Sequence, residues 1–159
     1  MDYEIERKFL VKKLPDLSGK TKQSFERYYL YRGEGIDIRI QKVNDIYEFE
    51  RKSETSELGR ETKKFEITKG EFAALKRSFG DVIVRDSYLI SENPETTIKI
   101  YHGKFEGLVR AEVEFTSKEN ANKFTPPSWM GEEITDTPLG RDSRLLDLTE
   151  EEFKKLLRK

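Results

Sequence analysis

The chain has 159 residues, enough for one domain with a hydrophobic core. Its 30 basic and 31 acidic side chains leave a net charge of −1, so no charge excess favours nucleic acid or an anionic membrane as a partner. The absence of cysteine excludes disulfides, and the single histidine excludes His-rich zinc sites. No apolar run approaches the ~20 residues of a membrane span, and no signal-peptide pattern opens the chain, so we expect a cytoplasmic protein.

Apolar and polar residues alternate along eight segments, which is the pattern of β-strands with two different faces. The expected strands cover residues 2–11, 22–31, 36–42, 46–52, 60–67, 82–90, 95–102 and 108–116. Gly, Asn, Asp and Pro between several of them predict turns that join antiparallel neighbours. Eight such strands predict a mainly β (α+β) fold: a closed eight-stranded antiparallel β-barrel with short covering helices, in a single domain over residues 1–159.

Three short helices are predicted where a threonine is followed by a glutamate three residues later, the capping-box pattern. The pairs are Thr68 with Glu71, Thr116 with Glu119 and Thr149 with Glu152. The stretch 125–144 is rich in proline and glycine and is predicted to be an ordered loop.

Periodicity alone leaves two interpretations of the strand faces. The apolar face could fill a packed barrel core with the charges in water, or the charged face could line a wet tunnel beneath helices that cover the apolar exterior. The second interpretation is favoured by the apolar stripes of the helices and by like-charged residues two apart on single strands. These like-charged pairs are Glu4 and Glu6, Glu48 and Glu50, and Glu112 and Glu114.

The opening run EIERKFL places Glu4, Glu6 and Lys8 on one face of the first expected strand. Two adjacent carboxylates repel each other unless a cation lies between them, and the lysine adds a position for an anion. A divalent metal ion together with a phosphate chain would satisfy all three groups.

With this ExExK motif, the second ExE at Glu112 and Glu114, and PPSWMGEEIT at 126–135, the chain resembles the CYTH superfamily, the triphosphate tunnel metalloenzymes. The resemblance covers nearly the full length. It implies an eight-stranded barrel around a charged tunnel, which binds linear triphosphates with Mg²⁺ or Mn²⁺. The activities of that family include inorganic triphosphatase, thiamine-triphosphatase, RNA 5′-triphosphatase and class IV adenylate cyclase.

The resemblance also implies roles for individual residues. The catalytic carboxylates would be Glu4, Glu6, Glu112 and Glu114, and the same four with Glu66 would bind the metal. The substrate-binding residues would be Lys8, Arg39, Lys52 and Arg85, with Arg60 and Lys99 as further candidates. Arg60 and Arg110 lie on the same strand faces as the residues expected to line the tunnel. Each could equally be the ion-pair partner of an acidic side chain.

Several positions depart from the family pattern. Gln41 and Ser87 stand where relatives commonly have basic residues, and Lys64 and Lys99 stand where acidic ones are common. Residues 140–142 read Gly-Arg-Asp where relatives often have Tyr-x-Asn. Metal binding through the two ExE pairs is therefore better supported than the identity of the substrate.

The sequence thus predicts metal-dependent hydrolysis of a linear triphosphate, with inorganic triphosphate as the first candidate. A class IV adenylate cyclase and a non-catalytic polyphosphate- or nucleotide-binding protein are the alternatives. The expected partner is a small triphosphate, and neither nucleic acid nor a membrane is expected to bind. Whether the chain forms a homodimer through apolar barrel surface is left open by the sequence.

Overall fold

The computed structural model describes residues 2–55, 59–76 and 82–158. Its strands are β1 Asp2–Val11, β2 Lys22–Gly33, β3 Ile36–Val43, β4 Ile46–Thr55, β5 Gly59–Ile67, β6 Val82–Glu92, β7 Glu95–His102, β8 Val109–Phe115 and β9 Met130–Glu133. Its α-helices are α1 Lys69–Lys76, α2 Lys118–Lys123, α3 Asp142–Leu145 and α4 Glu150–Leu157, and two 3₁₀ turns cover Gly103–Phe105 and Pro138–Gly140. Within these ranges no helix is long and apolar enough to cross a membrane.

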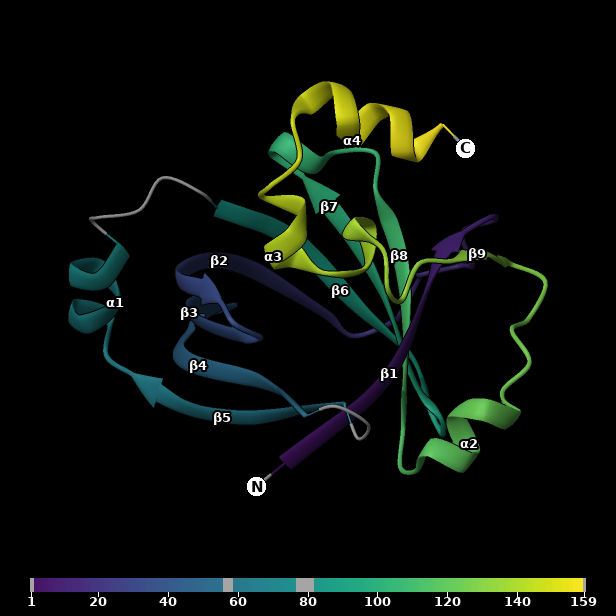
Figure 1. The fold of residues 1–159 in the computed structure, drawn as a ribbon, viewed down its shortest axis with the longest axis horizontal. Helices are drawn as coiled ribbons and strands as arrows, with labels where there is room; N and C mark the ends of the chain where they lie inside the picture. The colour runs from purple at the N-terminus through teal and green to yellow at the C-terminus, as the bar shows by residue number, and fades with distance from the viewer. Residues whose placement is uncertain (1, 56–58, 77–81, 159) are drawn as a thin grey trace.

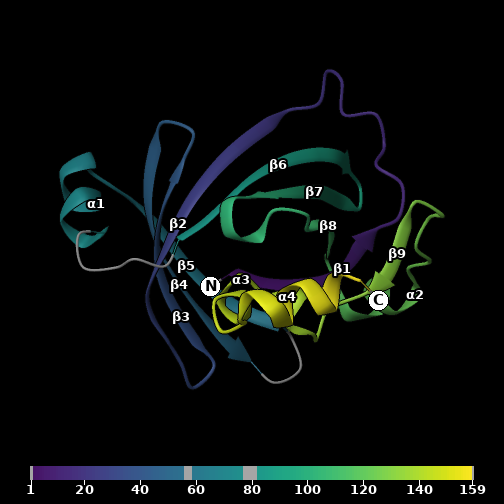
Figure 2. The same cartoon turned by 90° about the horizontal axis from the view of Figure 1, so that it is seen from above.

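The strands form one antiparallel sheet in the order β5-β4-β3-β2-β6-β7-β8-β1 (Figures 1 and 2). The sheet closes because β1 also pairs with β5, with Glu4 opposite Arg60. β9 adds to β1 outside this ring. The structure therefore confirms the predicted closed barrel of eight strands with few helices.

The charged faces of the strands point into the barrel. On β3, Arg39 and Gln41 face the interior and are only 4% and 2% exposed, although they are polar. Ile40 between them points outward and is buried against Phe72 of α1 and Ile67 of β5. The tunnel interpretation is therefore confirmed, and the apolar strand faces pack beneath the helices.

Two of the helices that cover the apolar exterior are anchored by aromatic side chains. Phe72 anchors α1 against the rings of Tyr28 and Tyr47, at centroid distances of 5.9 Å and 5.0 Å. Phe153 of α4 packs edge-on against Phe105, at 5.3 Å. Burial of these aromatic side chains contributes more to the stability of such short helices than intrinsic helix propensity does.

The capping boxes predicted at Thr68 and Thr149 are both present. The predicted box at Thr116 is wrong by one residue, because the side chain of Ser117 accepts the hydrogen bond from the backbone N–H of Asn120. Serine is the better N-cap of the two, whereas the prediction followed the spacing from Thr116 to Glu119.

The stretch predicted as a loop contains β9 and α3, and residues 134–147 form a closing segment at one end of the barrel. The backbone N–H of Ile134 donates to the carbonyl oxygen of Lys8 at 2.8 Å. The Lys8 ammonium in turn donates to the carbonyl oxygen of Gly140 at 2.8 Å. A side chain at Gly140 would place its Cβ 2.2 Å from the carbonyl oxygen of Ile134. Leu139 and Leu145 are buried in the core that this segment shares with the strand ends.

Replacing Phe72 by alanine should lower the free energy of unfolding by about 3 kcal/mol, because a buried aromatic side chain is lost and α1 loses its anchor. Leu75→Ala on the same helix is the matched control, and since Leu75 is 36% exposed it should cost less than about 1 kcal/mol. Urea unfolding monitored by circular dichroism measures both variants. Equal losses would contradict the covering role of α1.

Candidate active site: a charged cavity inside the barrel

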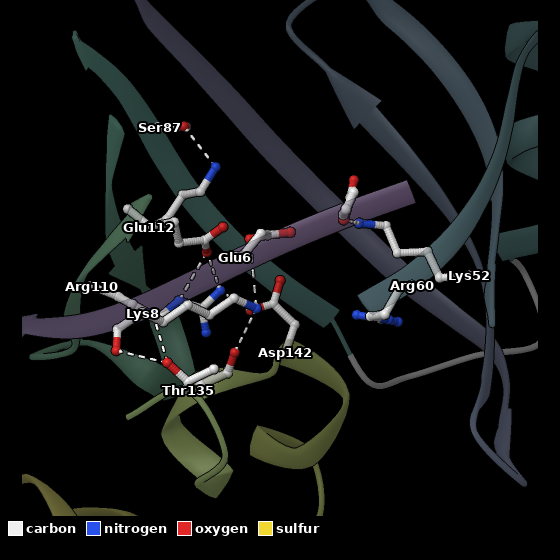
Figure 3. Close-up of polar contacts among 12 residues, drawn as sticks. Glu6, Lys8, Lys52, Arg60, Ser87, Arg110, Glu112, Thr135 and Asp142 are labelled. Carbon is white, nitrogen blue, oxygen red and sulfur yellow. Dashed lines mark hydrogen bonds and ion pairs between the residues drawn. The ribbon is translucent and has the colours of Figure 1, made fainter. Parts of the chain in front are cut away.

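The barrel encloses a cavity of about 250 Å³. Ten of the predicted site residues line it: Glu4, Glu6, Lys8, Arg39, Lys52, Arg60, Arg85, Lys99, Glu112 and Glu114. Figure 3 shows Lys8, Arg110 and Glu112 together on one side of the cavity, with Lys52 and Arg60 across from them. Glu66, the remaining predicted metal ligand, is exposed on β5 opposite Glu48 and is not among the described residues that line the cavity.

Glu6, Glu95 and Glu114 form a carboxylate patch across three neighbouring strands. Glu6 on β1 lies opposite Glu114 on β8, and Glu114 lies opposite Glu95 on β7. Burial together with the charge of Glu112 raises the pKa of Glu6 to about 7. Burial, a hydrogen bond with Glu95 and the charge of Glu6 raise the pKa of Glu114 to about 8. These carboxylates are therefore crowded and insufficiently neutralised.

Glu95 was missing from the predicted site, although a signal for it was present. It begins β7 and shares the phase of Thr97 and Lys99, which also line the cavity. The family pattern expects an acidic residue on this strand, and the resemblance placed Lys99 at that position. The structure instead supplies a carboxylate four residues earlier, beside Glu114.

Two cations of the cavity wall, Lys52 and Arg39, form ion pairs with carboxylates. The Lys52 ammonium lies 2.5 Å from a carboxylate oxygen of Glu4. Although burial alone would raise it, this contact with Lys52 lowers the pKa of Glu4 to about 2. Arg39 donates to Glu50 through Nε at 2.6 Å, and both side chains are buried. These pairs hold two predicted phosphate-binding cations in place within the wall.

The arginine ring consists of Arg27, Arg85 and Arg110, which surround the carboxylate of Asp142. Arg27 Nη1 lies 2.8 Å and Arg85 Nε 3.1 Å from Asp142 Oδ2, and Arg110 Nη2 lies 3.3 Å from Oδ1. The hydroxyl of Tyr101 donates to Oδ1 at 2.5 Å. Despite complete burial, the arginines hold the pKa of Asp142 well below its usual value.

Arg85 Nη1 has no hydrogen-bond partner among the described residues, although the side chain is buried and lines the cavity. An unpartnered buried donor carries a desolvation cost that an anion in the cavity would remove. The predicted role of Arg85 in substrate binding stays a prediction, and this donor is the atom that would meet a phosphoryl oxygen.

Glu112 and Lys99 belong to the basic side of the cavity. Glu112 accepts two hydrogen bonds from Arg110, at 2.6 Å and 3.0 Å. Burial would raise the pKa of Glu112, but the charges of Arg110, Lys99 and Lys8 hold it well below its usual value. Lys99 donates to Ser87 at 2.9 Å, and its burial lowers its pKa to about 7. Glu112 is thus an ion-pair partner of Arg110, and its charge also acts on Glu6.

Arg60 has one of the two roles that the sequence left open. Its Nη2 donates to Asp37 at 2.7 Å, so it is an ion-pair partner. It also lines the cavity, and its buried Nε has no partner among the described residues.

The chemistry of the carboxylate patch fits a hard divalent cation, which prefers carboxylate oxygens. Glu114 has no ion pair with a basic side chain among the described residues. A cation would relieve the repulsion that the raised pKa values of Glu6 and Glu114 report. Among the described side chains, however, no three acidic or imidazole groups already surround one point as ligands.

Known proteins similar to this chain are inorganic triphosphatases. One from Acetivibrio thermocellus is 30% identical over 163 aligned residues, which cover 97% of this chain and 99% of the relative. One from Nitrosomonas europaea is 29% identical over 136 residues, which cover 84% of this chain and 89% of the relative. The crystal structure of the inorganic triphosphatase NE1496 matches with a TM-score of 0.69 and 27% identity, covering 94% of this chain and 97% of that one.

No protein-family model matches the chain. Its identity to a relative of nearly the same length, together with the enclosed barrel, is sufficient to assign the family. The chain belongs to the CYTH superfamily, the triphosphate tunnel metalloenzymes.

Proposed function

We propose that this protein hydrolyses a short linear triphosphate, inorganic triphosphate in the first place, with a divalent metal ion. The observation that carries the proposal is the enclosed cavity, whose wall combines buried arginines and lysines with a crowded carboxylate patch. Similar proteins that are named inorganic triphosphatases support the choice of substrate.

The charge of the cavity supports a metal requirement. Ten of its lining side chains are basic and eight are acidic. A linear triphosphate carries about four to five negative charges near neutral pH, three from its strongly acidic protons and the rest from the two terminal phosphates, whose second pKa is about 6. The net positive charge of the wall is therefore smaller than the negative charge of the substrate, and a divalent cation would supply most of the missing positive charge. Mg²⁺ and Mn²⁺ both suit carboxylate oxygens, and we propose Mg²⁺ or Mn²⁺ as the cofactor.

The size and polarity of the cavity favour an inorganic substrate over a nucleotide. Its volume of about 250 Å³ is below the range of about 300–1,000 Å³ that is typical for pockets that hold drug-sized ligands. Phe25 and Tyr29 are the only aromatic residues that line it in the described part of the chain. Arg85 lies over the Phe25 ring at 4.6 Å, so this ring faces a guanidinium. An adenylate cyclase would need an apolar place for adenine, which this wall does not offer.

We assign the binding of the phosphate chain to Arg85, Lys8, Arg39 and Lys52, with Arg60 and Lys99 beside them. Arginine suits bidentate contacts to phosphoryl oxygens, and lysine supplies a point charge. Glu6, Glu114 and Glu95 would hold the metal, with Glu4 nearby. The metal would neutralise charge on the phosphoryl group and activate the attacking water. The protein itself contributes alignment of the chain and exclusion of bulk water by the closed wall.

Glu6→Gln should lower the rate of phosphate release from inorganic triphosphate by about 100-fold, because it removes a ligand of the proposed metal. Glu66→Gln is the matched control, since Glu66 is exposed on the same barrel outside the cavity lining, and it should keep the rate of the wild type. Colorimetric phosphate assays with Mg²⁺ or Mn²⁺ measure both variants.

The same assay with thiamine triphosphate, ATP and long-chain polyphosphate ranks the substrates, and cyclic AMP is measured in parallel. Cyclic AMP as the main product from ATP would establish the cyclase alternative. Tight triphosphate binding by the wild type without any release of phosphate would establish the non-catalytic one. Full activity of Glu6→Gln would contradict the assigned metal site.

The carboxylate patch predicts a pH dependence of stability. The folded protein keeps protons on Glu6 and Glu114 up to pH values of about 7 and 8, whereas the usual pKa is 4.5. In the presence of a chelator, the free energy of unfolding should therefore fall as the pH rises from about 5 to 8. Glu114→Gln should reduce this fall, and so should millimolar Mg²⁺.

Denaturant titrations at several pH values measure this slope, with Glu66→Gln as the control that keeps the slope of the wild type. Identical slopes for the wild type and Glu114→Gln would rule out the proposed crowding of the carboxylates.

A further inference from the structure

Asp142 holds a position inside the barrel that resembles a bound anion. Its two carboxylate oxygens accept from Arg27 Nη1, Arg85 Nε, Arg110 Nη2 and the Tyr101 hydroxyl, at 2.8, 3.1, 3.3 and 2.5 Å. These donors come from four neighbouring strands, β2, β6, β8 and β7. Asp142 is only 5% exposed and lines the cavity. A convergent set of arginines is the kind of site that binds phosphate, yet here the protein fills it with its own carboxylate.

The closing segment that carries Asp142 is tied to the barrel on several sides. Arg110 Nη1 donates to the carbonyl of Leu139 at 3.0 Å, and Arg32 Nη1 donates to that of Ser143 at 2.7 Å. Arg141 forms an ion pair with Glu54 at the end of β4. Together with the bond from Lys8 to Gly140, these contacts reach β1, β2, β4 and β8. The segment therefore closes this end of the barrel.

Glu95 of the carboxylate patch lies at the far end of the cavity wall from Asp142, whereas Glu6 lies nearer the closing segment, since Lys8 Nζ is 4.0 Å from Glu6 and 2.8 Å from the carbonyl oxygen of Gly140. Tyr101, which contacts Asp142, and Glu95 of the patch belong to the same strand and are six residues apart. This separation corresponds to about 20 Å along β7. Lys99 and Glu112 lie between them on the wall. The cavity wall thus extends from Glu95 to the arginine ring, where Asp142 takes the place of an anion.

We propose that Asp142 is a specificity-determining residue that limits the length of the polyphosphate chain the cavity accepts. This inference rests on the proposed function and deepens it. The Asp142 carboxylate occupies the place where one further phosphoryl group would meet the arginine ring, and its charge repels an incoming phosphate. Arg85 Nη1, which has no partner within the described part of the chain, meets the innermost phosphoryl group of a chain that stops short of Asp142.

The test is the ratio of kcat/KM for linear tetraphosphate to kcat/KM for linear triphosphate. Asp142→Ala removes both the charge and the bulk of the carboxylate, and it should raise this ratio by about tenfold. Asp142→Asn removes the charge alone and should raise it by a smaller factor. Asp147→Asn is the control on the same segment, because its side chain is exposed and pairs with Arg32 outside the cavity lining. It should leave the ratio unchanged.

Loss of the carboxylate leaves three arginines without their partner, so the melting temperature of each variant is measured first. Where the single variants do not fold, the double variant Arg27→Gln with Asp142→Asn removes one charge of each sign and takes their place. It should raise the ratio as well. An unchanged ratio in every folded variant would overturn the inference, because a merely structural Asp142 would affect both substrates equally.

Calorimetry of wild-type protein with linear triphosphate and Mg²⁺ separates this inference from the proposed function. Binding and hydrolysis of triphosphate by the wild type, with no change of the ratio in the Asp142 variants, would overturn the chain-length role alone. Failure of the wild type to bind triphosphate would overturn the proposed function and this inference with it.

Discussion

The structure depends on the pairing of charges inside a closed barrel. An unpaired ion away from water costs several kcal/mol, so inward-facing arginines and lysines are compatible with folding only when carboxylates accompany them. Arg39 with Glu50, Lys52 with Glu4 and the arginine ring with Asp142 meet this requirement. The same pairing keeps the cations positioned in the wall for a phosphate chain, so stability and binding draw on one set of residues.

Among the groups left out of this balance, two locate the proposed chemistry. The carboxylate patch has an excess of negative charge, and Arg85 Nη1 is a buried donor without a partner among the described residues. A metal ion would satisfy the first and a phosphoryl oxygen the second. Between the patch and Asp142, the wall offers charged side chains and little apolar surface, which suits an inorganic chain better than a nucleotide.

Alternation and turn residues predict the strands of this barrel well, because both are local properties of the sequence. Which face lies inside is decided by packing, and only the helix stripes, the like-charged pairs on single strands and the family resemblance favoured the correct answer. Arg27 and Asp142 were not predicted as site residues, since their roles arise from contacts between residues 115 positions apart. The four-residue β9 lies in a stretch where prolines and glycines dominate the local signal.

On the proposed function, the cavity binds a triphosphate whose charge is balanced jointly by the basic wall and a divalent cation. Titration calorimetry of linear triphosphate over a range of free Mg²⁺ concentrations tests this balance directly. We expect the affinity to rise steeply with free Mg²⁺ and metal to be taken up with the substrate. Equal affinity for triphosphate in a chelator and in millimolar Mg²⁺ would contradict it.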